Sequence, residues 1–145
     1  MRKLLLLPAL LFEMFFPLCG NICAASNNQQ LDRNQVYELR DRCRSSAEDF
    51  FKIIYKRINK ETTGASYKYH YNAIVNKCFF ILTRDKMDEN GNFSTKQLFD
   101  FNDCELLGTF SRDKHNNIVH GCNVLEKICH SEAEWDALVK PYMEK

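Results

Sequence analysis

A stripe of apolar residues begins after position 35 of the chain. Its members follow one another in steps of one, three or four positions: Val36, Leu39, Cys43, Ala47, Phe50, Phe51, Ile54, Tyr55 and Ile58. Steps of three and four place side chains on one face of a helix. The spacing therefore predicts an amphipathic helix here, with Cys43 on the face that turns toward the core.

A continuous apolar run over 78–82 predicts a buried strand. Another apolar run follows the segment 88–92, which contains the dipeptide Asn90-Gly91. Asn-Gly is typical of a two-residue hairpin loop, because a type I′ turn needs positive φ at both central positions. The sequence therefore predicts an antiparallel hairpin whose tip is formed by Asn90 and Gly91.

This tip implies a register for the two strands of the hairpin. Phe80 then faces Phe101, and Leu82 faces Phe99. Both pairs fall on one face of the sheet, where cross-strand apolar pairs are stabilising. Cys78 shares this face, so we expect the helix predicted above to cover it.

Three tyrosines alternate with polar residues over 67–71. Tyr67, Tyr69 and Tyr71 are separated by Lys68 and His70, which is the period of a strand with one aromatic face. We expect the first strand or an edge strand of the sheet here. The alternative is an aromatic platform that binds a sugar or a peptide.

The remaining elements complete an α+β fold. Two more short strands are predicted over 105–110 and 118–125. Ser131 and Glu134 form a capping box, and a short helix follows whose apolar face consists of Trp135, Leu138, Val139 and Tyr142. The sequence thus predicts a long N-terminal helix and a short C-terminal helix, packed on a small antiparallel sheet of about four to five strands.

The start of the chain has the order of a secretory signal peptide. Arg2 and Lys3 precede an apolar stretch over 4–12, which Glu13 interrupts. Small residues before position 26 fit cleavage after Ala25. An uncleaved N-terminal anchor is the weaker alternative, because a membrane-spanning helix needs about 20 apolar residues.

We therefore expect a signal peptide over 1–25, a polar spacer over 26–30 and a single α+β domain over 31–145. The chain of 145 residues has 20 basic and 19 acidic residues, and removing the signal leaves 18 of each. A mature chain without net charge gives no electrostatic reason to expect a nucleic-acid partner. We also expect no integral membrane segment after cleavage.

Five of the seven cysteines follow the expected cleavage site. In an oxidising compartment five cysteines predict two disulfides and one free thiol, and spacing alone leaves many pairings open. Packing of the helix on the sheet would bring Cys43 to Cys78, whereas Cys122 and Cys129 flank a short turn. We therefore expect the disulfides Cys43–Cys78 and Cys122–Cys129, with Cys104 as the free thiol.

Two kinds of site chemistry can be weighed against this disulfide framework. A zinc site would use His120, Cys122, Cys129 and His130. Cysteines of an exported protein are more often oxidised, which favours the disulfide. A nucleophilic Cys104 is disfavoured by its two acidic neighbours, which oppose formation of the thiolate. We expect no metal ion, no cofactor and no catalytic residue.

The chain also resembles a group of small exported bacterial proteins of unknown function. The stretches that carry the resemblance are His70-Tyr71-Asn72, Asn76-Lys77-Cys78-Phe79 and the segment 131–143. The resemblance implies cysteines near the places of Cys43, Cys78, Cys122 and Cys129, and Cys104 departs from that pattern. It implies no activity.

Because no catalytic pattern is present, the sequence favours a non-enzymatic, periplasmic or secreted protein-interaction module. Its expected partner is another envelope, secretion-machinery or host protein. One alternative is a small-ligand carrier that uses the strand of Tyr67, Tyr69 and Tyr71. The other is a small hydrolase or thiol enzyme whose site is assembled from residues scattered along the chain.

Overall fold

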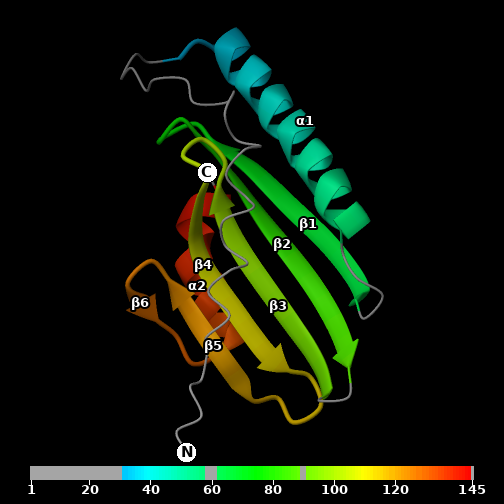
Figure 1. The fold of residues 1–145 in the computed structure, drawn as a ribbon. Coiled ribbons are helices and arrows are strands. Elements are labelled where there is room, and N and C mark those ends of the chain that lie inside the picture. The colour runs from blue at the N-terminus through cyan, green and yellow to red at the C-terminus, as the bar shows by residue number, and fades with distance from the viewer. Residues whose placement is uncertain (1–30, 58–61, 89–90, 145) are drawn as a thin grey trace, which may run out of the picture.

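The computed structural model describes residues 31–57, 62–88 and 91–144. The expected signal peptide over 1–25 and spacer over 26–30 lie outside the described residues. The described elements, in chain order, are α1 (Arg33–Arg57), β1 (Thr62–Asn72), β2 (Lys77–Asp88), β3 (Gly91–Asp100), β4 (Glu105–Asp113), β5 (Val119–Val124), β6 (Lys127–Ile128) and α2 (Glu132–Met143) (Figure 1). Among these residues, no helix is both long enough and apolar enough to cross a membrane.

The strands form one antiparallel sheet in the order β1-β2-β3-β4-β5-β6. The fold class is therefore α+β, as predicted, but the described residues form six strands instead of the expected four to five. The extra strand is β6, in which Lys127 pairs with Val124 and Ile128 with Asn123. A two-residue strand has no apolar run or alternation, so the sequence pattern did not predict it.

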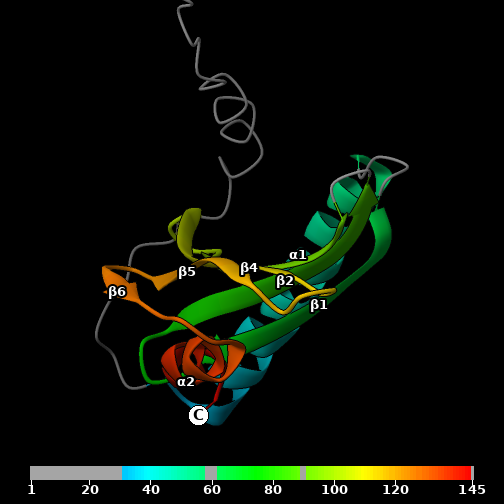
Figure 2. The ribbon, with the colours of Figure 1, turned by 90° about the horizontal axis from the view of Figure 1, so that it is seen from below.

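The two helices cover opposite faces of the sheet (Figures 1 and 2). Successive side chains of a strand point to opposite faces, and β2 shows this directly. Phe80 and Leu82 pack in the core under α1, whereas Phe79 and Ile81 pack in the core under α2. The hydrophobic core is therefore divided by the sheet into two layers, and each helix closes one of them.

The predicted hairpin is formed by β2 and β3, but its register is different. Phe80 pairs with Phe99 and Leu82 pairs with Gln97, so the expected pair of Phe80 with Phe101 is wrong. A slip of one residue would move every side chain to the other face, whereas this shift of two residues keeps each one on its predicted face. Alternation of apolar residues therefore does not distinguish the two registers.

The turn decides the register of this hairpin. Gly91 pairs with Asp88 and is the first residue of β3, so it does not occupy the predicted tip. Asn90 lies outside the described residues. Gly91 has a φ of 138°, a conformation that side chains with a Cβ rarely adopt. The glycine is therefore required at the start of the strand instead of in the centre of the turn.

Two disulfides join the described elements, and they are the pairs that the sequence favoured. Cys43–Cys78 links α1 to β2, with a Cα–Cα distance of 5.5 Å, and Cys122–Cys129 links β5 to the residue after β6, with a distance of 5.0 Å. Disulfides persist in oxidising compartments and are rare in the cytosol. The pair therefore indicates an oxidising compartment.

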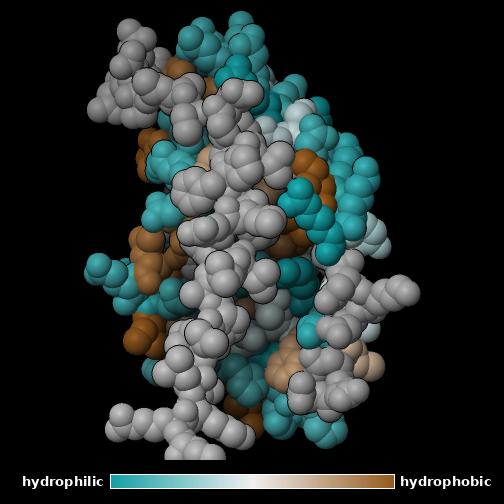
Figure 3. Space-filling view, viewed as in Figure 1, coloured by the Kyte–Doolittle hydropathy of each residue, from teal (hydrophilic) through white to brown (hydrophobic). Residues whose placement is uncertain are grey.

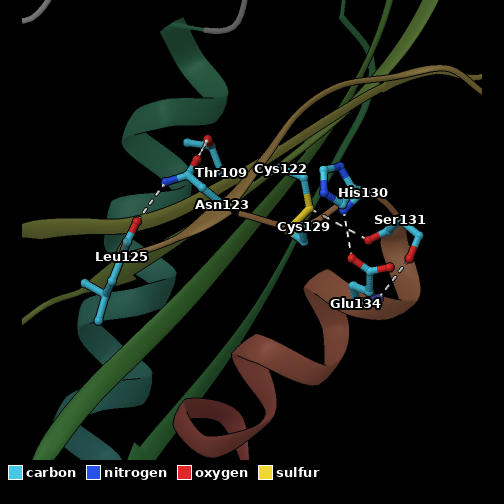
Figure 4. The surroundings of a disulfide bond; sticks show 8 residues. All are labelled: Thr109, Cys122, Asn123, Leu125, Cys129, His130, Ser131 and Glu134. Carbon is cyan, nitrogen blue, oxygen red and sulfur yellow. Dashed lines mark hydrogen bonds between the residues drawn. A yellow bond between two sulfur atoms is a disulfide. The ribbon is translucent and has the colours of Figure 1, made fainter. Parts of the chain in front are cut away.

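The second disulfide lies beside the start of α2 (Figure 4). The hydroxyl of Ser131, the N-cap residue, accepts a hydrogen bond from the Glu134 backbone N–H at 3.2 Å. The Glu134 carboxylate accepts one from the His130 backbone N–H at 2.9 Å. Sγ of Cys122 is 3.7 Å from the Ser131 carbonyl oxygen. The predicted cap is thus present, and the disulfide positions the segment that enters the helix.

The bonding state of Cys104 differs from the expectation. It lies exposed in the turn between β3 and β4, with a positive φ of 55°, and it is disulfide-bonded in the structure. The expectation that Cys104 is a free thiol is therefore wrong. That expectation counted only the five cysteines that follow position 25 of the chain.

Candidate functional site

Strand β1 forms one edge of the sheet and lies between the two helices. Residues 64–72 pair with β2 without interruption, and a register shift occurs only between Thr62 and Gly64. Within the described ranges, no strand pairs with the other side of β1. An edge strand presents unpaired backbone N–H and C=O groups on that side. We call this outward side of residues 64–72 the β1 edge.

The three predicted tyrosines lie on the face of β1 that turns toward α1. The ring of Tyr67 is 4.5 Å from that of Phe51 and 5.5 Å from that of Phe80. Tyr71 is buried, whereas Tyr69 is 38% exposed. Helix α1 therefore covers most of the proposed aromatic platform, and Tyr69 is the tyrosine that offers surface. The expectation of a first or edge strand is confirmed.

Side chains at the end of β1 hold the strand in place. The Tyr71 hydroxyl donates a hydrogen bond to Asn76 Oδ1 at 2.6 Å. Burial raises the pKa of this hydroxyl, and the neighbouring charge of Arg40 opposes the shift. The Asn72 amide donates a hydrogen bond to the carbonyl of Pro141 in α2 at 3.0 Å. The end of β1 is thus bonded both to the β1–β2 turn and to α2.

A cleft of about 250 Å³ separates β1 from α1. We call it the α1 cleft; it is lined by Arg40, Asp41, Arg44, Tyr69, His70 and Tyr71. Arg44 forms an ion pair with Asp41 at 3.2 Å. Arg40 has no ion-pair partner within the described part of the chain. One positive charge is therefore left uncompensated beside the β1 edge.

A larger cleft, of about 690 Å³, lies between β1 and α2. We call it the α2 cleft. Its lining consists of the apolar residues Ile81, Val139 and Met143, the rings of β1 at Tyr67 and Tyr69, and the charged residues Lys68, Lys96, Asp136, Lys140 and Glu144. Lys140 pairs with Glu144 at 3.5 Å, and Lys96 pairs with Asp136 at 3.1 Å. Lys68 has no ion-pair partner among residues 31–57, 62–88 and 91–144. The α2 cleft thus has an apolar floor and an uncompensated lysine on the β1 side.

A charged cluster fixes the position of α2 on the sheet. The Lys96 ammonium lies 5.2 Å from the centroid of the Trp135 ring and 2.7 Å from the Glu132 carboxylate. Arg112 contacts the same carboxylate, also at 2.7 Å. The hydrogen bond from Lys96 holds the pKa of Glu132 below its ordinary value. The α2 wall of the cleft is therefore held by buried contacts and ion pairs together.

The geometry excludes the four-ligand zinc site that the sequence offered as an alternative. The zinc alternative fails because its two cysteines, Cys122 and Cys129, are bonded to each other. Neither cleft is lined by a serine, threonine or cysteine that could act as a nucleophile. The structure does bring together an edge strand, exposed cations and an apolar floor. Such a set of groups can bind an extended polypeptide chain.

Sequence reasoning identified β1 but missed the residues on either side of it. Arg40 and Arg44 are four residues apart on α1, and this spacing, which places side chains on one helix face, could have marked them. The α2 side offered no such signal, because Lys68 and Met143 are far apart in the sequence. The chain matches no protein-family model, no curated protein and no solved structure.

Proposed function

We propose that this chain is a non-enzymatic, exported protein-interaction module. It binds another envelope, secretion-machinery or host protein through the β1 edge and the two clefts beside it. The observation that carries the proposal is a regular edge strand whose outward side opens between two clefts, each with an uncompensated cation. Edges of this kind bind other chains through main-chain hydrogen bonds.

The disulfides support the exported part of the proposal. One disulfide joins α1 to β2 and a second lies beside α2, and structural disulfides of this kind are typical of compartments in which thiols are oxidised. The signal peptide over 1–25, which would direct the chain to such a compartment, remains a prediction. Sequencing the N-terminus of the exported protein tests that prediction, and the expected first residue is Ser26.

A small-ligand carrier is the second candidate, and one observation favours it. The volume of the α2 cleft falls within the range of about 300 to 1,000 Å³ that small-molecule sites occupy. Its lining combines five charged residues with apolar and aromatic ones, which suits a peptide with both charged and apolar side chains better than a wholly apolar ligand. Native mass spectrometry of the exported protein distinguishes the two, since a carrier would retain a small molecule of defined mass.

Site-specific photo-crosslinking tests the proposed function. A photoreactive amino acid replaces Tyr69 at the β1 edge, and in a control it replaces Ile128 on β6, which is 76% exposed at the opposite edge of the sheet. We expect a crosslinked partner protein from position 69 and none from position 128. Equal crosslinking from both positions, or none from position 69, would contradict the proposal.

A further inference from the structure

We infer that the β1 edge takes up an extended, acidic segment of the partner as an additional strand of the sheet. The side chains of this segment alternate between carboxylates beside the α1 cleft and apolar groups in the α2 cleft. The inference rests on the proposed function and specifies the chemistry of the partner. It follows from three features of the edge: its regular length, the alternation of its faces and its charge.

The length of the edge suits a short peptide. Residues 64–72 offer nine consecutive positions in regular pairing geometry. At about 3.3 Å for each residue they span roughly 30 Å. Helices α1 and α2 lie on either side of this span without a described strand beyond it. The edge therefore has the length of a segment of about nine residues.

The side-chain directions in β1 determine those in the added strand. Side chains of neighbouring strands that lie opposite each other share a face of the sheet. Partner residues opposite Tyr67, Tyr69 and Tyr71 therefore point to the α1 side, and those opposite Lys68 point to the α2 side. Consecutive partner side chains thus reach the two clefts in turn.

The α1 side selects for a carboxylate. Arg40 and Arg44 line the cleft there, and only Arg44 has an acidic partner, Asp41, in the described residues. A guanidinium binds a carboxylate through two parallel hydrogen bonds. The exposed ring of Tyr69 adds a surface on which the stem of a glutamate can pack. An acidic side chain is therefore complementary to this cleft.

The α2 side selects for an apolar side chain. Ile81, Val139 and Met143 line the cleft, and a methionine adapts its shape to different partners. Lys68 lies where the cleft meets the β1 edge and adds a positive charge to it. A partner segment with net negative charge is therefore attracted by positive charges on both sides of the edge, while its alternate apolar residues fill the α2 cleft.

The same charges argue against a second copy of this chain as the occupant. Two β1 edges paired antiparallel about Lys68 would bring the two lysines together, and each copy would also add its Arg40. Like charges directly opposite each other in a sheet are destabilising. Lysine on an edge strand is also a common means of preventing pairing between identical edges. An acidic partner is therefore favoured over self-association.

The test uses the oxidised protein and a blocked nine-residue peptide of alternating glutamate and valine. Amide hydrogen exchange is followed by NMR with and without the peptide. We expect slower exchange at every second amide of residues 64–72, because only the outward amides gain a partner. Reversing the charge of Arg40 and Arg44 to Glu should weaken binding about tenfold at low salt. Arg42→Glu, on the same helix but outside the cleft lining, should leave it unchanged.

Three outcomes would overturn the inference. One is equal binding of a lysine–valine peptide, and another is binding of the glutamate–valine peptide without slower exchange in β1. The third is slow exchange in β1 that grows with protein concentration alone, which would show a second copy on the edge. A partner crosslinked through position 69, with no binding of the acidic peptide, would leave the proposed function intact and refute strand addition alone.

Discussion

Gly108 pairs with Val124 at a point where β4 and β5 leave no room for a side chain. A Cβ atom at Gly108 would lie 2.8 Å from the carbonyl oxygen of Asn123 and 3.2 Å from Cα of Val124. Both atoms belong to the backbone, so neither can move without disturbing the strand. We expect Gly108→Ala to lower the free energy of unfolding by about 1 to 3 kcal/mol in chemical denaturation.

Gly121 provides the matched control for this substitution. It is exposed on the neighbouring strand, and a Cβ atom there would meet no atom within 4 Å. Gly121→Ala should change the free energy of unfolding by less than about 0.5 kcal/mol. If both substitutions lowered the free energy of unfolding equally, the close approach of the β4 and β5 backbones at Gly108 would not be the cause of the loss.

The contact between Lys96 and Glu132 should make the stability of the protein depend on pH. The hydrogen bond from Lys96 lowers the pKa of Glu132 from its ordinary value of 4.5, although desolvation opposes the shift. A carboxyl whose pKa is lowered by folding stabilises the folded state above its unfolded-state pKa. It loses that contribution as the pH falls through the folded-state pKa. We therefore expect Glu132→Gln to reduce the stability at pH 7 by about 1 kcal/mol.

The difference should shrink as the pH is lowered from 7 toward 3, because the native carboxyl is progressively protonated as the pH falls through its folded-state pKa. Thermal unfolding of the two proteins over this pH range measures it. Glu105→Gln, at an exposed position at the start of β4, controls for the general loss of a negative charge. A difference between native protein and variant that stays constant from pH 7 to pH 3 would contradict the assigned role of the Lys96–Glu132 contact.

At the level of elements, the two disulfides should contribute unequally to stability. Cys43–Cys78 spans 35 residues and joins α1 to the sheet, whereas Cys122–Cys129 spans seven residues at the β5–β6 turn. The loop-entropy model gives about 4 kcal/mol for the longer loop and about 2 kcal/mol for the shorter one. Replacing both cysteines of a pair by alanine avoids leaving an unpaired thiol. The Cys43/Cys78 variant should therefore have the lower denaturation midpoint, and the reverse order would refute the expected ranking.

The elements that the sequence predicted are those encoded by local patterns. Helix α1 follows from the spacing of its apolar residues, and α2 follows from the cap at Ser131. The pairing of Cys43 with Cys78 followed from the faces of two such elements. The register of β2 and β3 could not be predicted from these faces, because a shift of two residues leaves Phe80 on the same face of the sheet. Geometry at the turn selects between the predicted and the observed register.

The candidate site was predictable only in part for the same reason. The alternation of the tyrosines marks β1 as a strand with one aromatic face. Whether those rings are exposed depends on the placement of α1, which buries Tyr71 and leaves part of Tyr69 accessible. The α2 cleft forms only because the chain returns to β1 at its C-terminal end, where Asn72 bonds to Pro141. Contacts between such distant segments leave no periodic signal in the sequence.

Considered as a whole, the molecule has one sheet with two very different edges. The β6 edge is two residues long, and Leu125 and Ile128 beside it are exposed. Hydrophobic surface is visible on the left side of the molecule in Figure 3, the side on which Figure 1 places β6. An edge this short offers few backbone groups to another chain. The β1 edge is regular over nine positions and lies between two clefts. The architecture therefore concentrates the capacity for strand pairing on β1.

Hydrogen exchange of the protein in complex with its captured partner tests this assignment most directly. The partner identified by crosslinking through position 69 is added to the free protein, and exchange is compared by mass spectrometry over residues 62–72 and 119–128. We predict slower exchange over 62–72 in the complex, with residues 119–128 unchanged. Slower exchange confined to 119–128, with β1 unchanged, would contradict the assignment of the β1 edge as the binding surface.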